Sequence, residues 1–202
     1  MLVYPTPKIR PKIRIQLSSS TKNGKKMKKK EGESSAQCRI VAALKSCAVL
    51  KDYERGVEIH NHIVKLGFLE KNLVIGCTLV DMYAKCGSLT KAKEAFDKLP
   101  SRDVVSWTCL ISGCTQHGDY EEALESFKQM QGEGISPDAF TFVFALKACG
   151  GLRSVDQGQE MHAQIAGEVS LRTNPIVGNA LVDMYAKCNA LTMATEVFDQ
   201  LP

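Results

Sequence analysis

Three common sequence patterns are missing, and each absence narrows the class of protein. No stretch alternates apolar and polar residues as a half-buried β-strand does. No run is long and apolar enough to cross a membrane. The eight cysteines include no C-x-x-C pair, so neither a zinc site nor another metal cofactor is expected. The sequence therefore argues against a β-sheet fold, a membrane-spanning helix and a metal centre.

What the chain does contain is an internal repeat with a period of 102 residues. Residues 37–100 align without a gap to residues 139–202, and 29 of the 64 aligned positions are identical. The string LVDMYAKC, for example, occurs at Leu79–Cys86 and again at Leu181–Cys188. Self-similarity at a fixed period is typical of repeat architectures, in which each unit packs on its neighbours. Function is then expected along an extended surface rather than in one pocket.

The long period divides into shorter units that each predict a pair of helices. In residues 104–138, Trp107, Leu110 and Ile111 share one face of a first helix, and Gly118 ends it. A second apolar stripe with helical spacing follows in the same unit. We therefore predict an all-α solenoid. The predicted domains are a basic disordered leader, residues 1–36, and a helical array, residues 37–202, with units 37–72, 73–103, 104–138, 139–174 and 175–202.

Four of the cysteines occupy two positions that recur in the repeat. Cys47 and Cys149 are equivalent, as are Cys86 and Cys188, and each has small or apolar neighbours. Such placement is typical of buried thiols that pack as small apolar side chains. We predict this packing role rather than disulfide bonds, and a reducing compartment.

The N-terminal 36 residues differ in composition from the rest of the chain. They hold 10 basic and 2 acidic residues, a net charge of +8, whereas the remainder holds 16 basic and 20 acidic residues, a net charge of −4. A basic leader that is rich in hydroxyl groups and has no acid before Glu31 resembles an organellar transit peptide. The lysine cluster Lys25–Lys30 fits a nuclear signal or a nucleic-acid-binding arm instead, and a disordered solvated tail is a third interpretation. The predicted location is the mitochondrion or chloroplast, with the nucleus as the alternative.

The helical units resemble a known family of repeats. The segment VVSWTCLISGCTQHGDYEEALESFKQMQGEGISPD at Val104–Asp138 is similar to the pentatricopeptide repeat of 35 residues. The 36-residue units, with ALKSC and ALKAC, resemble its long variant, and the 31-residue unit, with VIGCTLVDMYAKCGSLTKAKEAFDKLPSRD, resembles its short variant. This alternation of long, short and standard units is similar to the plant organellar subclass most associated with RNA editing. The resemblance covers Gln37 to Pro202 and implies a right-handed α-solenoid.

The same resemblance implies sequence-specific binding of single-stranded RNA, with one base for each repeat. Two side chains are then expected at the Watson–Crick edge of a base, and in the standard unit these are Thr108 and Asp138. A hydroxyl and a carboxylate can both accept hydrogen bonds from guanine N1 and N2, whereas adenine would turn its N1 lone pair toward the carboxylate. Without the resemblance, Thr108 would be an ordinary surface threonine and Asp138 a turn residue. The residues expected to clamp the face of a base are Val74, Val105 and Ile176.

The remaining units offer fewer recognition groups. Cys77 is expected to act with Asp103, but a thiol is a weak hydrogen-bond partner. Asn179 is expected, by the resemblance, to favour a pyrimidine, whereas Val41 and Val143 in the long units cannot form hydrogen bonds. A base contact contributes about 1–3 kcal/mol before ordering costs, so these units predict weak binding, about micromolar or worse.

Two other classes of function compete with RNA recognition. A protein-interaction scaffold of tetratricopeptide type would suit the acidic array, but that family keeps a uniform period of about 34 residues. An enzyme is not expected, because the deaminase-like domain of many plant relatives needs H-x-E and C-x-x-C motifs around zinc, and neither motif occurs. The expected partners are single-stranded RNA and other RNA-processing or editing proteins, with no membrane, no cofactor and no small-molecule substrate.

The last unit ends earlier than its copy. It stops at Pro202, whereas the copy continues through Asp103 before the next helix begins. We therefore expect an incomplete array that lacks the polar end cap of a solenoid, with Leu191, Val197 and Phe198 partly exposed.

Overall fold

The computed structural model describes residues 25–69 and 72–201, and these residues form eleven helices and no β-strand. In the four repeats after unit 37–72, the first helix is α3 (Leu73–Lys85), α5 (Val104–His117), α7 (Ala139–Leu152) or α10 (Pro175–Lys187). The second helix is α2 (Tyr53–Lys65), α4 (Leu89–Asp97), α6 (Tyr120–Gly132), α8 (Val155–Ala166) or α11 (Leu191–Asp199), and α9 (Val169–Arg172) is one additional turn.

Helix α1 spans Lys25–Leu50 and starts within the predicted leader. Residues 25–36 are therefore helical rather than disordered, because lysine, methionine and glutamate are good helix formers and no proline interrupts them. Residues 1–24, which carry the rest of the predicted leader, lie outside the described residues.

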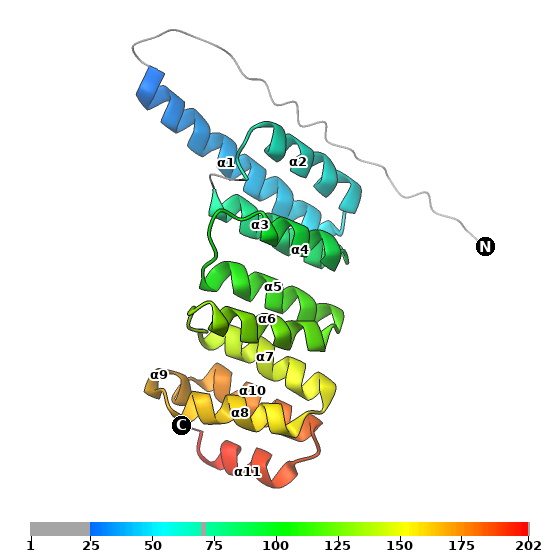
Figure 1. Ribbon diagram of the computed structural model, residues 1–202, viewed down its shortest axis with the longest axis vertical. Coiled ribbons are helices and arrows are strands. Elements are labelled where there is room, and N and C mark those ends of the chain that lie inside the picture. The colour runs from blue at the N-terminus through cyan, green and yellow to red at the C-terminus, as the bar shows by residue number, and fades with distance from the viewer. Residues whose placement is uncertain (1–24, 70–71, 202) are drawn as a thin grey trace, which may run out of the picture. The chain divides into compact units, whose positions relative to one another are not determined.

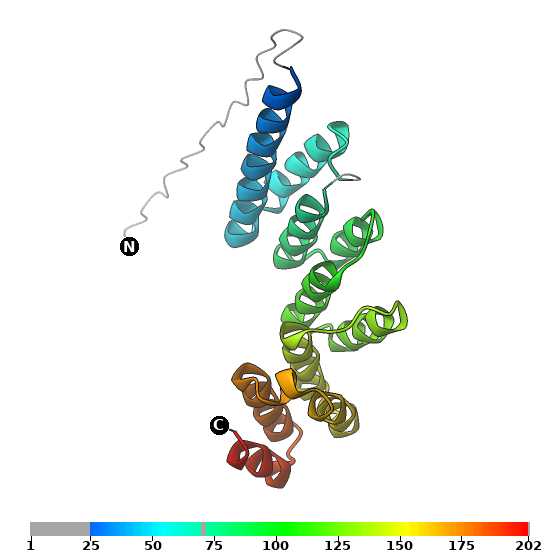
Figure 2. The ribbon, with the colours of Figure 1, turned by 90° about the vertical axis from the view of Figure 1, so that its left-hand side faces the viewer.

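Within residues 37–201 the helices are arranged in two layers. Helices α3, α5, α7 and α10 pack against one another in chain order, and α4, α6, α8 and α11 each pack on the first helix of their own unit. Figure 1 shows this succession along the array, and Figure 2 shows α4, α6 and α8 on the same side of α3, α5 and α7. The prediction of an all-α solenoid is confirmed. Gly118, predicted to end the helix that carries Trp107, follows α5 with φ 86°.

The core between the layers is continuous from one repeat to the next. Trp107 of α5 is 1% exposed and packs edge-to-face on Phe96 of α4, with ring centroids 4.6 Å apart. Neighbouring first helices approach closely where one of them has glycine. A Cβ atom on Gly113 would lie 2.6 Å from the Cβ of Ala84, so α5 and α3 touch through their smallest side chains.

The last described helix differs from its copy in exposure. Phe198 is 64% exposed although its equivalent, Phe96, is 2% exposed, and Leu191 is 62% exposed, as predicted for both residues. The prediction for Val197 is wrong, because this side chain is 8% exposed and belongs to the core that α11 shares with α10.

The repeated cysteines pack in the same way in both copies. Cys47 and Cys149 are buried, as predicted, and Cys86 and Cys188 are partly buried. The sulfur of Cys86 lies 3.8 Å from the carbonyl oxygen of Cys47, and the sulfur of Cys188 lies 3.9 Å from that of Cys149. Burial raises the pKa of the Cys149 thiol to about 12, so it stays protonated at neutral pH.

Two histidine–tyrosine pairs connect a second helix to the first helix of the next repeat. His60 Nδ1 lies 2.7 Å from the Tyr83 hydroxyl, and His162 Nδ1 lies 2.9 Å from the Tyr185 hydroxyl. The rings of each pair meet edge-to-face, with centroids 5.5 and 5.7 Å apart. Both tyrosines are almost fully buried, and His60 Nε2 is buried with no partner among the described residues. These histidines therefore contribute to packing.

We expect the free energy of unfolding to decrease as the pH is lowered from about 7 to about 5.5. Burial lowers the pKa of His60 and of His162, and for His60 the charges of Lys98 and Lys91 lower it further while Glu94 opposes them. An unfolded histidine has a pKa of about 6.5 and takes up its proton first, so acid favours the unfolded chain. Urea unfolding followed by circular dichroism at the two pH values measures the effect.

The double variant His60→Gln, His162→Gln serves as the control. It removes both titrating rings and is expected to lose most of this pH dependence. A double variant with the pH dependence of the parent chain would contradict the assignment to the two pairs.

Candidate nucleic-acid interface

The first helices of four successive repeats begin with the same type of cap. Asn72, Asp103, Asp138 and Asn174 precede α3, α5, α7 and α10, and the side-chain oxygen of each accepts a hydrogen bond from a backbone N–H of the first turn. The distances from the capped N–H nitrogens range from 2.8 Å at Asp138 to 3.5 Å for the longer of two bonds at Asn174. Each cap is also the last residue of a predicted unit, so the predicted second recognition residue doubles as a helix cap.

An exposed apolar row lies two residues after these caps. It consists of Val74, Val105, Phe140 and Ile176, with exposed fractions of 64%, 56%, 60% and 51%. The same helical position thus carries an exposed large apolar side chain in four successive repeats, which offers an apolar contact point in each repeat. Val74, Val105 and Ile176 were predicted from the sequence, whereas Phe140 was not, although its place two residues after Asp138 was a sufficient signal.

The fifth residue after each cap is the predicted base-recognition position, and its exposure varies. Thr108 and Val143 are partly buried, and Asn179 is exposed with no side-chain hydrogen bond to another described residue. Cys77 is only 7% exposed. Burial raises the pKa of its thiol to about 12, and Cys109 and Asp103 nearby add to the increase, so the thiol stays protonated. The structure therefore leaves Cys77 the least accessible of these side chains.

Thr141 contacts both predicted recognition residues of the standard unit, Thr108 and Asp138. The Thr108 hydroxyl oxygen lies 2.7 Å from that of Thr141, and the Thr141 hydroxyl donates to Asp138 Oδ1 at 2.7 Å. Thr141 belongs to α7 and is completely buried, whereas Asp138 is exposed. The result is a continuous chain of hydrogen-bonding oxygens from α5 to the cap of α7.

The preceding repeat boundary has a similar cap without that connection. Ser106 N–H donates to Asp103 Oδ1 at 2.9 Å, and the Asp103 N–H donates to Ser106 Oγ at 2.9 Å. The Ser106 hydroxyl then donates to the carbonyl oxygen of Asp103 and forms no bond with Cys77. Cys77 and Asp103 are thus not joined as Thr108 and Asp138 are.

Metal binding and membrane insertion find no support among the described residues. No group of three or more histidine, cysteine, aspartate or glutamate side chains among the described residues is placed to hold a metal ion. Among the described helices, none has the length and apolar character needed to span a bilayer.

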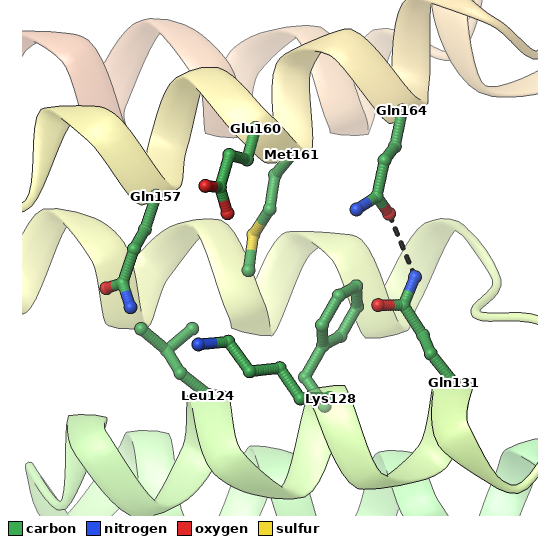
Figure 3. Close-up of a pocket in the computed structure, with 8 residues that line it drawn as sticks. Leu124, Lys128, Gln131, Gln157, Glu160, Met161 and Gln164 are labelled. Carbon is green, nitrogen blue, oxygen red and sulfur yellow. Dashed lines mark hydrogen bonds between the residues drawn. The ribbon is translucent and has the colours of Figure 1, made fainter.

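A small cleft lies between the second helices α6 and α8 (Figure 3). Its lining is amide, charged and apolar, and Gln131 Nε2 donates to Gln164 Oε1 at 2.9 Å across it. The lining residues are Leu124, Phe127, Lys128, Gln131, Gln157, Glu160, Met161 and Gln164.

Comparison with known proteins identifies similar repeats. Residues 102–151 match the model of the PPR repeat family, and residues 77–104 match the PPR repeat. A pentatricopeptide repeat-containing protein of Arabidopsis thaliana is 39% identical over 176 residues, which cover 87% of this chain and 25% of the relative. Another from Arabidopsis thaliana, named chloroplastic, is 44% identical over 163 residues, 81% of this chain and 26% of the relative. The chain thus spans about a quarter of the length of these relatives.

A solved structure shows the same fold. The crystal structure of the pentatricopeptide repeat protein PPR10 from maize matches with a TM-score of 0.57 and 24% sequence identity. The match covers 80% of this chain and 25% of that chain. The helical pairs described above therefore stack as in a known solenoid.

We expect Asp103→Ala to lower the free energy of unfolding by about 1 kcal/mol, the usual effect of removing a helix cap. Asp119→Ala is the matched control, because Asp119 precedes α6 but its side chain forms no cap hydrogen bond. The control should change stability by less than about 0.5 kcal/mol. Urea unfolding of both variants measures the difference, and equal losses would contradict the capping role of Asp103.

Proposed function

The chain belongs to the pentatricopeptide repeat family, and on that premise we propose that it binds single-stranded RNA with base selectivity. The proposed binding edge is the series of first-helix N-termini that carries the caps and the exposed apolar row. The proposed process is organellar RNA processing, such as RNA editing, since the alternation of long, short and standard units resembles the subclass associated with it. The observation that carries the proposal is the connected set of Thr108, Thr141 and Asp138 next to the exposed Val105.

Guanine is the base proposed for the standard unit. Asp138 Oδ1 already accepts from the N–H and the hydroxyl of Thr141, while its second carboxylate oxygen forms no hydrogen bond with another described residue. That oxygen and the Thr108 hydroxyl oxygen are both available as acceptors. Of the four bases, guanine alone presents two adjacent donors on its Watson–Crick edge. The chemistry of the two side chains therefore favours guanine over adenine.

The other units contribute unequally to the proposed binding. Val105, Val74 and Ile176 are exposed and are proposed to clamp base faces, and Phe140 offers an aromatic face at the equivalent position in a long unit. Asn179 is exposed and can both donate and accept hydrogen bonds, which suits the edge of a pyrimidine. Recognition by Cys77 with Asp103 is the weakest assignment, because the thiol is buried and protonated.

The proposed role is recognition rather than catalysis. The described residues form a helical scaffold with capping and exposed apolar side chains at the starts of its first helices. Editing or processing chemistry would then be supplied by other RNA-processing proteins, which we propose as partners. A mitochondrial or chloroplast location is proposed, and it is supported by relatives whose names carry the words chloroplastic or mitochondrial.

We expect Asp138→Asn to shift the preferred purine from guanine toward adenine. Asparagine caps a helix about as well as aspartate, so the α7 cap should persist. Its NH2 group, in place of the second carboxylate oxygen, can donate to adenine N1 but cannot accept from a guanine N–H. Fluorescence anisotropy titrations with short uridine RNAs carrying one guanine or one adenine should show the ratio of the two dissociation constants changing by about tenfold.

Asp119→Asn provides the control for this experiment, since Asp119 precedes a second helix and forms no side-chain cap bond. Its base preference should equal that of the parent chain. If neither the parent chain nor Asp138→Asn distinguishes the two purines, the assignment of Thr108 and Asp138 is refuted.

The leader generates a separate prediction about location. A fluorescent protein fused behind residues 1–36 is expected to enter mitochondria or chloroplasts in plant cells, because basic, hydroxyl-rich leaders direct such import. An exclusively nuclear signal would instead assign the targeting activity to Lys25–Lys30. Diffuse fluorescence would contradict a targeting function of this segment.

A further inference from the structure

Thr141 lies outside the standard unit yet contacts both of its recognition residues. It is the third residue of α7, in the next repeat, and its side chain is completely buried. Its hydroxyl lies 2.7 Å from the Thr108 hydroxyl and 2.7 Å from Asp138 Oδ1, and its backbone N–H donates to the same Oδ1 at 2.8 Å. One buried side chain thus fixes the distance between a hydroxyl and a carboxylate that come from different helices.

The positions of the hydroxyl hydrogens of Thr108 and Thr141 determine whether Thr108 donates a hydrogen bond to a ligand or accepts one from it. The Thr108 hydroxyl oxygen is also 2.7 Å from the carbonyl oxygen of Val104. Three short oxygen–oxygen contacts therefore share the two hydroxyl hydrogens of Thr108 and Thr141. The Val104 carbonyl and the Asp138 carboxylate can only accept, so the Thr108 hydrogen points either to Val104 or to Thr141. In each arrangement the Thr108 hydrogen is used within the protein, so this hydroxyl can only accept a hydrogen bond from a ligand.

The other repeat boundaries do not have this connection. The residues at the same place in α3, α5 and α10 are Ile75, Ser106 and Val177. Two of them have no hydroxyl, and the Ser106 hydroxyl bonds back to Asp103 instead of reaching the recognition position of the preceding repeat. Among the described repeats, the bridge is specific to the boundary that carries the proposed guanine site.

We propose that Thr141 is a positioning residue for guanine recognition, a role that rests on the proposed function. Its hydroxyl links the Asp138 carboxylate to the Thr108 oxygen and so restrains both acceptors relative to each other. It contacts no base itself. Specificity for one base is therefore set by three side chains from two repeats, and the third is buried.

The test compares base preference in the parent chain and in Thr141→Val, which keeps the shape of the side chain and removes the hydroxyl. The probes are short uridine RNAs that carry one guanine or one adenine. We expect the preference for guanine to fall about fivefold or more in Thr141→Val, while affinity for the all-uridine RNA stays within about twofold. Thr141→Ser restores the hydroxyl and should restore the preference. Thr141→Ala removes it with less bulk, should Thr141→Val fold poorly.

Ser106→Ala is the matched control, because it removes the equivalent cap hydroxyl one repeat earlier, where that hydroxyl bonds to Asp103 and reaches neither Thr108 nor Asp138. It should leave the guanine preference unchanged. A parent chain that shows no guanine preference would overturn the proposed function. A parent chain that shows it, together with Thr141→Val or Thr141→Ala that retains it, would overturn the role of Thr141 alone. A loss of preference in Ser106→Ala as large as in Thr141→Val would also overturn that role, because it would assign the effect to helix capping.

Discussion

Close contact between successive first helices is the constraint on which the proposed binding edge depends. Gly113 of α5 faces Ala84 of α3, where an added Cβ would meet the alanine Cβ at 2.6 Å. Gly150 of α7 faces Met184 of α10 in a similar way, with the methionine Cα 3.4 Å from the position of an added Cβ. These contacts set how far apart neighbouring helices lie, and so how far apart their N-terminal turns lie. This packing therefore also sets the spacing of the caps and of the apolar row.

Much of the fold could be predicted because residues 37–100 and 139–202 carry the same helical pattern, and because the apolar spacing between them is also helical. The spacing of Trp107 and its neighbours and the position of Gly118 predict α5 without any tertiary information. What the sequence could not predict depends on packing or on local detail. The burial of Val197 follows from the contact between α11 and α10. Helix α9 forms at Val169–Arg172, where the copy instead turns with Gly67 at φ 63°.

Two residues of the candidate site could be predicted from the sequence, but the hydrogen bonds that join them through a third residue could not. Thr108 and Asp138 follow from the family pattern, and the structure places them within one hydrogen-bonded group. Thr141 was missed because the spacing of Asp138 and Thr141 indicates only a helix cap, and the contact with Thr108 crosses from one helix to another. The burial of Cys77 is likewise invisible in the sequence, since it arises where α5 packs on α3.

The contact between Thr108 and Thr141 restricts where the gene for such a repeat array can recombine without loss of that contact. The junction between Asp138 and Ala139 is the natural place to cut if repeats are treated as interchangeable blocks. A recombination event at that junction keeps every residue of the unit 104–138 but separates Thr108 from its hydroxyl partner in α7. A transplanted unit would keep its hydrogen-bonded pair only beside a neighbour with threonine or serine at the third helical position. The arrangement is preserved when the unit is inherited together with the start of the next unit. Engineered arrays are therefore better divided inside a second helix.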